Sequence, residues 1–154
     1  VDVGDKQETR RVAVAEGLLR MAPATFEALQ AGRTPKGDPL LVAQIAGIQG
    51  GKRTADLIPL CHPLALAQLD VELEPDASLP GVRARATARV NGRTGVEMEA
   101  LTAVSVALLA AYDMLKAVDR EMRIEGVRVI SKEGGRSGSW QAGPPGPDKR
   151  EGPA

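Results

Sequence analysis

The chain has 154 residues, and its 20 basic and 20 acidic residues give a formal net charge of zero. This balance excludes a general field for binding polyanions, and an aromatic content of 2% excludes the stacking platforms of single-stranded nucleic-acid binders. A single cysteine allows no internal disulfide, and we recognise neither a signal peptide nor an apolar run of membrane-spanning length. We therefore expect a cytoplasmic protein of one folded domain, with no nucleic-acid or membrane partner.

The first forty residues predict a strand and two helix starts. Residues 10–15 alternate between larger and smaller side chains, as in a β-strand. Pro23 suits the first turn of a helix that would end at Gly32. Asp38 is a predicted N-cap, and Pro39 follows it at the first position of a second helix.

The middle of the chain combines a turn with two alternating segments. Residues 47–64 contain glycine pairs, basic residues and two prolines, which predicts a defined turn instead of regular structure. Residues 66–74 and 82–90 alternate between apolar and polar side chains, as half-solvated strands do. We expect both segments to belong to one sheet.

The long helix that follows has an apolar middle between charged ends. Residues 100–109 are apolar or small, as in a helix that is buried on most faces, whereas Glu97 lies before them and Asp113 and Lys116 lie after them. These charges have purely structural explanations. Thr94 and Glu97 fit a capping box, and the spacing of Asp113 and Lys116 fits a surface ion pair.

The length of this helix limits how its two charged ends can be used. If Glu97 and Asp113 lie on one continuous helix, their positions are about 24 Å apart. One small-molecule site cannot use both ends of one copy of such a helix. Because a two-fold axis would bring the start of one copy to the end of another, we favour a dimer.

The C-terminal part predicts a strand, a loop and a tail. The strand covers residues 124–131 with an interruption at Gly126, and a basic, glycine-rich loop covers residues 132–138. Residues 141–154 are rich in Pro, Gly and charge, so we expect a disordered tail. The order of elements is that of a split βαβ unit. We therefore predict an α+β, ferredoxin-like sandwich in residues 1–140, with a mainly antiparallel four-stranded sheet and helices packed on one face.

Few residues stand out for chemistry on their own. His62 is the only histidine and follows the only cysteine, Cys61. Because structural zinc needs four well-spaced ligands, this pair is a poor metal site, and we expect no metal-binding residues. His62 could be a hydrogen-bonded residue of a tight turn, or it could bind an anion together with Lys52 and Arg53. The loop at 132–138 has the composition of a phosphate-binding nest, which alone is a weak signal.

Two longer stretches carry a resemblance to a known family. Residues 52–64, KRTADLIPLCHPL, and residues 94–103, TGVEMEALTA, closely resemble the molybdenum cofactor biosynthesis protein C family, the cyclic pyranopterin monophosphate synthases. Shorter matches in the same order extend the resemblance from Val1 to about Trp140. It implies a ferredoxin-like subunit, assembled as a homohexamer of three dimers, with active sites at the dimer interface.

The resemblance also implies a reaction and its site. The substrate would be the GTP-derived 3′,8-cyclo-7,8-dihydro-GTP, which a lyase converts to cyclic pyranopterin monophosphate and pyrophosphate. No organic cofactor or resident metal is implied, although Mg²⁺ can accompany the triphosphate. The implied catalytic residues are Lys36, Asp113 and Lys116. The implied substrate-binding residues are Lys52, Arg53, Cys61, His62, Glu97, Met98, Glu99, Lys132 and Arg136.

We hypothesise a division of labour among these residues. Lys36 and Lys116 would transfer protons, with Asp113 orienting Lys116. The glutamates would contact the guanine-derived ring, and His62 and the remaining cations would hold the triphosphate. Two departures from the family pattern lie in the last loop, where Glu133 adds an acid and Arg136 replaces a lysine.

Other functions fit part of the pattern. A ferredoxin-like regulatory module that binds a nucleotide at a subunit interface would explain the cationic loops and the dimer. It would not require acids and bases at both ends of a buried helix. An enzyme of related fold that acts on ordinary nucleoside triphosphates would turn over GTP itself. RNA binding fits poorly with the missing aromatics and the absence of net charge.

Overall fold

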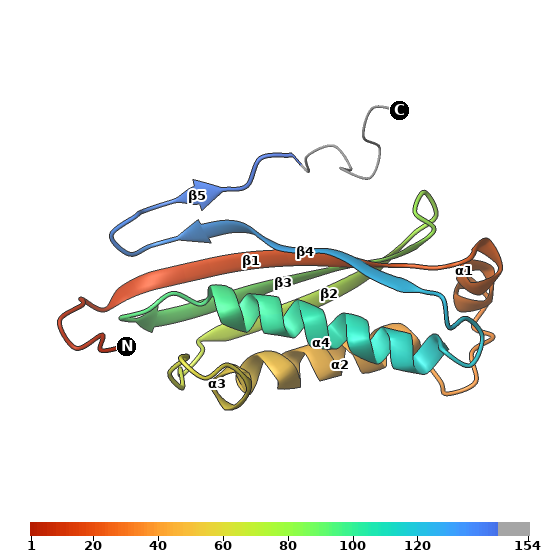
Figure 1. Ribbon diagram of the computed structural model, residues 1–154, viewed down its shortest axis with the longest axis horizontal. Coiled ribbons are helices and arrows are strands. Elements are labelled where there is room, and N and C mark those ends of the chain that lie inside the picture. Colours follow the sequence, from red (N-terminus) through yellow and green to blue (C-terminus); the bar gives the residue numbers. More distant parts are fainter. Residues whose placement is uncertain (145–154) are drawn as a thin grey trace.

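Two layers make up residues 1–144, which are the residues that this computed structural model describes: an antiparallel sheet and helices against one of its faces (Figure 1). The elements in chain order are β1 (Thr9–Arg20), α1 (Pro23–Gln30), α2 (Pro39–Lys52), α3 (Thr54–Leu57), β2 (Gln68–Asp76), β3 (Gly81–Gly92), α4 (Glu97–Leu115), β4 (Arg123–Glu133) and β5 (Trp140–Gln141). The strand order is β2-β3-β1-β4-β5, and all neighbours are antiparallel.

This arrangement confirms the predicted ferredoxin-like α+β fold, with the short β5 added to the four expected strands. β5 includes Gln141, the first residue of the expected tail, and residues 145–154 of that tail lie outside the described residues. The predicted interruption of the last strand is also present. Gly126 has a φ of 64°, and the register between β1 and β4 shifts beside it. A β-bulge of this kind bends the strand and is suited to glycine.

Small side chains on the inner face of the sheet allow the helices to pack closely against it. Along β3, Ala84, Ala86 and Ala88 are buried against the helical layer, while Arg83 and Arg85, at alternate positions of the same strand, are exposed. The alternation confirms the prediction of a half-solvated strand. Alanines on the inner face let the helix axes approach the sheet.

Residues 47–64 depart from the expected turn, because α2 continues through Lys52 and α3 follows at once. The glycines that suggested a turn lie in the helix and face α4. A side-chain carbon at Gly50 would lie 2.6 Å from Val106 Cγ2, and one at Gly47 would lie 2.9 Å from the Ala103 carbonyl oxygen. Gly51 is similarly close to Leu69. Close packing on α4 therefore outweighs the low helix propensity of glycine.

α4 is one continuous helix, as predicted, and it is the centre of the core. The predicted capping box is wrong: Val96 occupies the N-cap position, and no side chain caps the helix there. α4 is long and apolar enough to cross a membrane, although the sequence analysis predicted no segment of that length. However, 56% of its most apolar 18-residue stretch is buried inside the described fold.

Two carboxylates cap the shorter helices. Asp38 accepts hydrogen bonds from the Leu40 and Leu41 amides at 3.1 and 3.2 Å, which confirms it as the N-cap of α2. Asp119, in the turn after α4, accepts hydrogen bonds from the Ala22 amide and the Thr25 hydroxyl, both at 3.0 Å. The start of α1 is thereby held by a residue far away in the sequence.

Candidate active site

The C-terminal end of α4 carries the first cluster of ionised groups, Lys36, Asp113 and Lys116. Lys116 Nζ lies 2.7 Å from Asp113 Oδ1, and Lys36 Nζ lies 3.5 Å from Asp113 Oδ2. Asp113 and Lys116 are one helical turn apart, whereas Lys36 comes from the loop between α1 and α2. The structure thus brings together all three residues expected to be catalytic.

Asp113 remains ionised in this cluster. The hydrogen bond and charge of Lys116, and then the charge of Lys36, lower the pKa of its carboxyl group. All three side chains are about half exposed, at 46–55%. At this exposure the two ion pairs contribute little to stability.

The N-terminal end of α4 borders a second cluster, formed by Lys52, Arg53, His62 and Glu99. These residues line a hollow of about 260 Å³ between the end of α2, α3 and the loop that precedes β2. His62 Nε2 lies 2.6 Å from the Val1 carbonyl oxygen, so that the N-terminal segment closes one side of this region. The hollow places two cations and a histidine beside a carboxyl group.

Glu99 differs from every other carboxyl group in the predicted site because it is buried, at 5% exposure. Burial, and then the charge of Glu97, raises the pKa of the Glu99 carboxyl group. Burial and the charge of Glu99 also raise the pKa of the Cys61 thiol, which places the two groups near each other. Glu99 and Cys61 therefore keep their protons to a higher pH than an ordinary glutamate and an ordinary cysteine do.

The last two predicted residues lie outside both clusters. Lys132 is on β4, which continues to Glu133 instead of ending at residue 131 as predicted, and Arg136 is in the loop between β4 and β5. Lys132 Nζ donates to the Gly134 carbonyl oxygen at 3.4 Å and contacts Ser137 Oγ, while Arg136 is exposed. Figure 1 shows this loop at the same end of the molecule as α3 and the start of α4. Met98, on the first turn of α4, is 36% exposed at that end.

The first and second clusters are too far apart to form one site within a chain. Glu99 and Asp113 are fourteen positions apart on α4, which corresponds to about 21 Å. Fourteen positions are also close to four full turns, so both side chains project from the same side of the helix. The described part of the chain thus presents two separate clusters on one side of α4.

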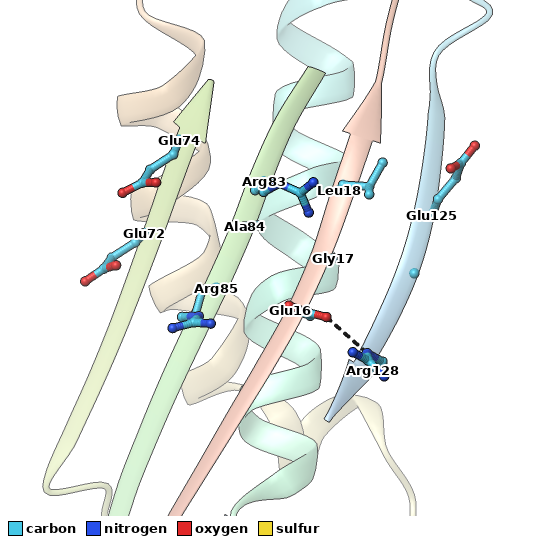
Figure 2. Close-up of a pocket in the computed structure, with 11 residues that line it drawn as sticks. Glu16, Gly17, Leu18, Glu72, Glu74, Arg83, Ala84, Arg85, Glu125 and Arg128 are labelled. Carbon is cyan, nitrogen blue, oxygen red and sulfur yellow. Dashed lines mark hydrogen bonds and ion pairs between the residues drawn. The ribbon is translucent and has the colours of Figure 1, made fainter. Parts of the chain in front are cut away.

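A larger hollow, of about 660 Å³, lies on the opposite face of the sheet and contains none of the predicted site residues (Figure 2). Charged side chains from β1 to β4 line it on the side away from the helices. Glu16 Oε1 binds Arg128 Nε at 3.0 Å, and Glu72 and Glu74 are register partners of Arg85 and Arg83. The smaller hollow, in contrast, contains four of the predicted site residues, Lys52, Arg53, His62 and Glu99.

Within residues 1–144, no three His, Cys, Asp or Glu residues are grouped so that they could hold a metal ion.

The fold is ferredoxin-like, and its two clusters contain the acids, bases and cations that acid–base enzymes use. The sequence model of the MoaC family matches residues 1–135. Cyclic pyranopterin monophosphate synthase of Brucella ovis is 59% identical over 145 residues, which are 94% of this chain and 88% of that protein. The protein of the same name from Dinoroseobacter shibae is 58% identical over 142 residues, 92% of this chain and 90% of its own. The chain belongs to the MoaC family and is a lyase with a role in molybdenum cofactor biosynthesis.

Proposed function

We propose that the chain converts 3′,8-cyclo-7,8-dihydro-GTP to cyclic pyranopterin monophosphate and pyrophosphate. The observation that carries this proposal is the Lys36–Asp113–Lys116 cluster, in a chain 59% identical to a protein named for that product. The reaction opens the imidazole ring, rebuilds a pyrazine and closes a cyclic phosphate. Each step moves protons onto or off nitrogen and oxygen, so positioned acids and bases are its main requirement.

The first cluster would supply the proton transfers. Asp113 contacts both ammonium groups and is held ionised, so it can fix the position of Lys116 Nζ while Lys36 approaches from the other side. Two lysines beside one carboxylate can pass a proton to and from the reacting ring without a further group. This arrangement supports Lys36 and Lys116 as the catalytic pair and Asp113 as the residue that orients them.

The second cluster would hold the substrate. Lys52, Arg53 and His62 face one hollow and can bind phosphate oxygens through charge-assisted hydrogen bonds. Glu99 at the back of the hollow can accept a hydrogen bond from an N–H group of the guanine-derived ring. Displacement of pyrophosphate places extra negative charge on the leaving group, which the same cations stabilise.

A dimer would join the two clusters into one site. Between Glu99 and Asp113, α4 exposes Leu109 at 57%, and α2 beside it exposes Ile45 at 50% and Val42 at 40%. If two copies pack through these apolar residues about a two-fold axis, the first cluster of each copy meets the second cluster of the other. We further propose that such dimers assemble as hexamers and work in the cytoplasm, with no organic cofactor.

Mass spectrometry of a turnover reaction tests the proposed function. Purified wild-type protein and Lys116→Ala would each be incubated with 3′,8-cyclo-7,8-dihydro-GTP, and with GTP as a control substrate. Cyclic pyranopterin monophosphate and pyrophosphate formed from the cyclised substrate, by the wild type alone, is the expected result. Bound but unaltered substrate would favour the regulatory module instead, and turnover of GTP would favour an ordinary nucleotide enzyme.

A further inference from the structure

Arg11, a residue that the sequence did not single out, joins β1 to the segment that leads into α4. Its Nε donates to the Gly92 carbonyl oxygen at 2.9 Å, and its Nη2 donates to the Arg93 carbonyl oxygen at 3.3 Å. These two carbonyls end β3 and begin the link to Glu97. The guanidinium group therefore holds the segment that precedes α4 through two of its N–H donors.

The same guanidinium group lies against the β4–β5 loop, whose Gly134 and Ser137 contact the Lys132 ammonium group. A side-chain carbon at Gly135 would overlap Arg11 Nη1, and one at Gly134 would overlap the Arg10 carbonyl oxygen. Both glycines have positive φ angles, 93° at Gly134 and 79° at Gly135. Gly134 therefore has no room for a side chain beside the Arg10 carbonyl group, and Gly135 packs directly against the Arg11 guanidinium group.

Arg11 binds these segments without a carboxylate partner. The ion pairs found within residues 1–144 include Arg20, Arg83 and Arg128, each bound to an acid, but not Arg11. Its donors go to backbone carbonyls that belong to a different strand. A planar fork with several fixed N–H groups can make these contacts at once, whereas a lysine ammonium is a single point charge.

We propose that Arg11 is a positioning residue that locks the β4–β5 loop onto the β3–α4 link. It would so fix Arg136, and the loop atoms of Gly134 and Ser137 that hold the Lys132 ammonium group, relative to Glu97. As a catalytic statement this rests on the proposed function, because Lys132 and Arg136 act as phosphate-binding groups only if the substrate is the triphosphate. The clamp itself is a structural property of the free protein. The two parts can therefore be tested separately.

Arg11→Lys is the central test variant, because it keeps the charge and removes the fork. We expect the KM for the cyclised substrate to rise about tenfold, the effect of losing one charged hydrogen bond, while kcat changes less than about threefold. Trp140, the only tryptophan, follows the loop and is 48% exposed, so its fluorescence reports on the loop without substrate. We expect acrylamide to quench Trp140 more strongly in Arg11→Lys than in the wild type.

Glycine variants test the clamp from the side of the loop. Gly135→Ala should raise KM and Trp140 quenching as Arg11→Lys does, and the double variant should be no worse than either single one, because both break the same contact. Gly138→Ala is the matched control. Gly138 also has a positive φ, 63°, but a side-chain carbon there meets no atom within 4 Å. It reports the backbone strain alone and should change KM and quenching much less.

Several results would overturn the clamp. Wild-type KM and quenching in Arg11→Lys, together with a raised KM in Arg11→Gln, would mean that Arg11 acts as a charge and not as a fork. Equal effects of Gly135→Ala and Gly138→Ala would assign the effect to strain. If the wild type produces no cyclic pyranopterin monophosphate, the proposed function fails, and unchanged Trp140 quenching in both Arg11→Lys and Gly135→Ala would still reject the clamp.

Discussion

The two ends of α4 hold carboxyl groups in opposite ways. At the C-terminal end, Asp113 is 55% exposed, contacts two lysines and has a lowered pKa. At the N-terminal end, Glu99 is 5% exposed and has a pKa raised by burial. Asp113 thus stays ionised to a lower pH than an ordinary aspartate, and Glu99 keeps its proton to a higher pH than an ordinary glutamate. The difference shows that environment, more than residue type, divides acid from base along one helix.

The largest effect is expected from removing Lys116. Lys116→Ala should lower kcat by about 10²–10⁴-fold, the range for loss of a general acid or base. Because the Lys116–Asp113 pair is exposed, the melting temperature should hardly change. Steady-state kinetics and thermal denaturation would be measured together. Lys6→Ala, which removes another exposed lysine, is the control and should retain wild-type turnover.

The next largest effect is expected from a substitution in the proposed dimer interface. Leu109→Asp places a charge in the proposed interface and should give monomers with less than about a tenth of the activity, since burying an unpaired carboxylate is strongly unfavourable. Light scattering coupled to gel filtration would measure the mass. Ile124→Asp introduces the same charge at another exposed apolar residue, on β4. Monomers from both variants, or from neither, would argue against an interface at Leu109.

The packing of α2 on α4 should respond to a single methyl group. Gly50→Ala would place its side chain against Val106, and we expect a loss of about 1–3 kcal/mol in the free energy of unfolding, as for other overpacked cores. The gain in helix propensity, about 1 kcal/mol, opposes this loss. Urea denaturation would measure the balance. Gln49→Ala, at the exposed neighbouring position, should be close to neutral, and a stabilised Gly50→Ala would contradict the close approach.

The smallest expected effect is on the pH dependence of folding stability, which should differ in sign between Glu99 and Asp113 at the two ends of α4. The raised pKa of Glu99 means that its contribution to stability is fully present below its ordinary value of 4.5 and is lost as the pH rises through the raised value. Glu99→Gln should therefore be more stable than the wild type at neutral pH, with the gap closing in acid.

Asp113 should show the opposite sign. Its lowered pKa gives stability that is present above its ordinary value of 3.8 and is lost as the pH falls through the lowered value. Asp113→Asn should thus be slightly less stable than the wild type at neutral pH and equal to it in strong acid. Melting temperatures of both variants between about pH 2 and 8 would reveal the two signs, and parallel curves would refute the comparison.

Local patterns in the sequence predicted the elements more reliably than their contacts. The alternation in residues 82–90 and the capping by Asp38 depend on neighbours in the chain, and both are found in the structure. The spacing of Asp113 and Lys116 likewise predicted their ion pair. Lys36, 77 positions before Asp113, reaches it only through the fold, so its placement could be expected from the family resemblance alone.

The features that the sequence failed to predict have a common physical cause. Gly47 and Gly50 have the local character of a turn, but packing against α4 keeps them in a helix. Arg11 carried no signal because its partners are backbone carbonyls, which every residue possesses. The burial of Glu99 was also invisible, since a glutamate in a first helical turn is usually solvated. In each case tertiary contact overrides a local preference.

Subunit complementation tests most directly whether one active site combines the two ends of α4 from different copies. Lys116→Ala and Glu99→Gln, each impaired alone, would be unfolded together, refolded as a mixture and assayed for cyclic pyranopterin monophosphate. If the sites are shared across a two-fold axis, each mixed dimer contains one intact site, and random pairing should restore about a quarter of the wild-type activity. Activity no higher than the average of the two variants would contradict a shared site.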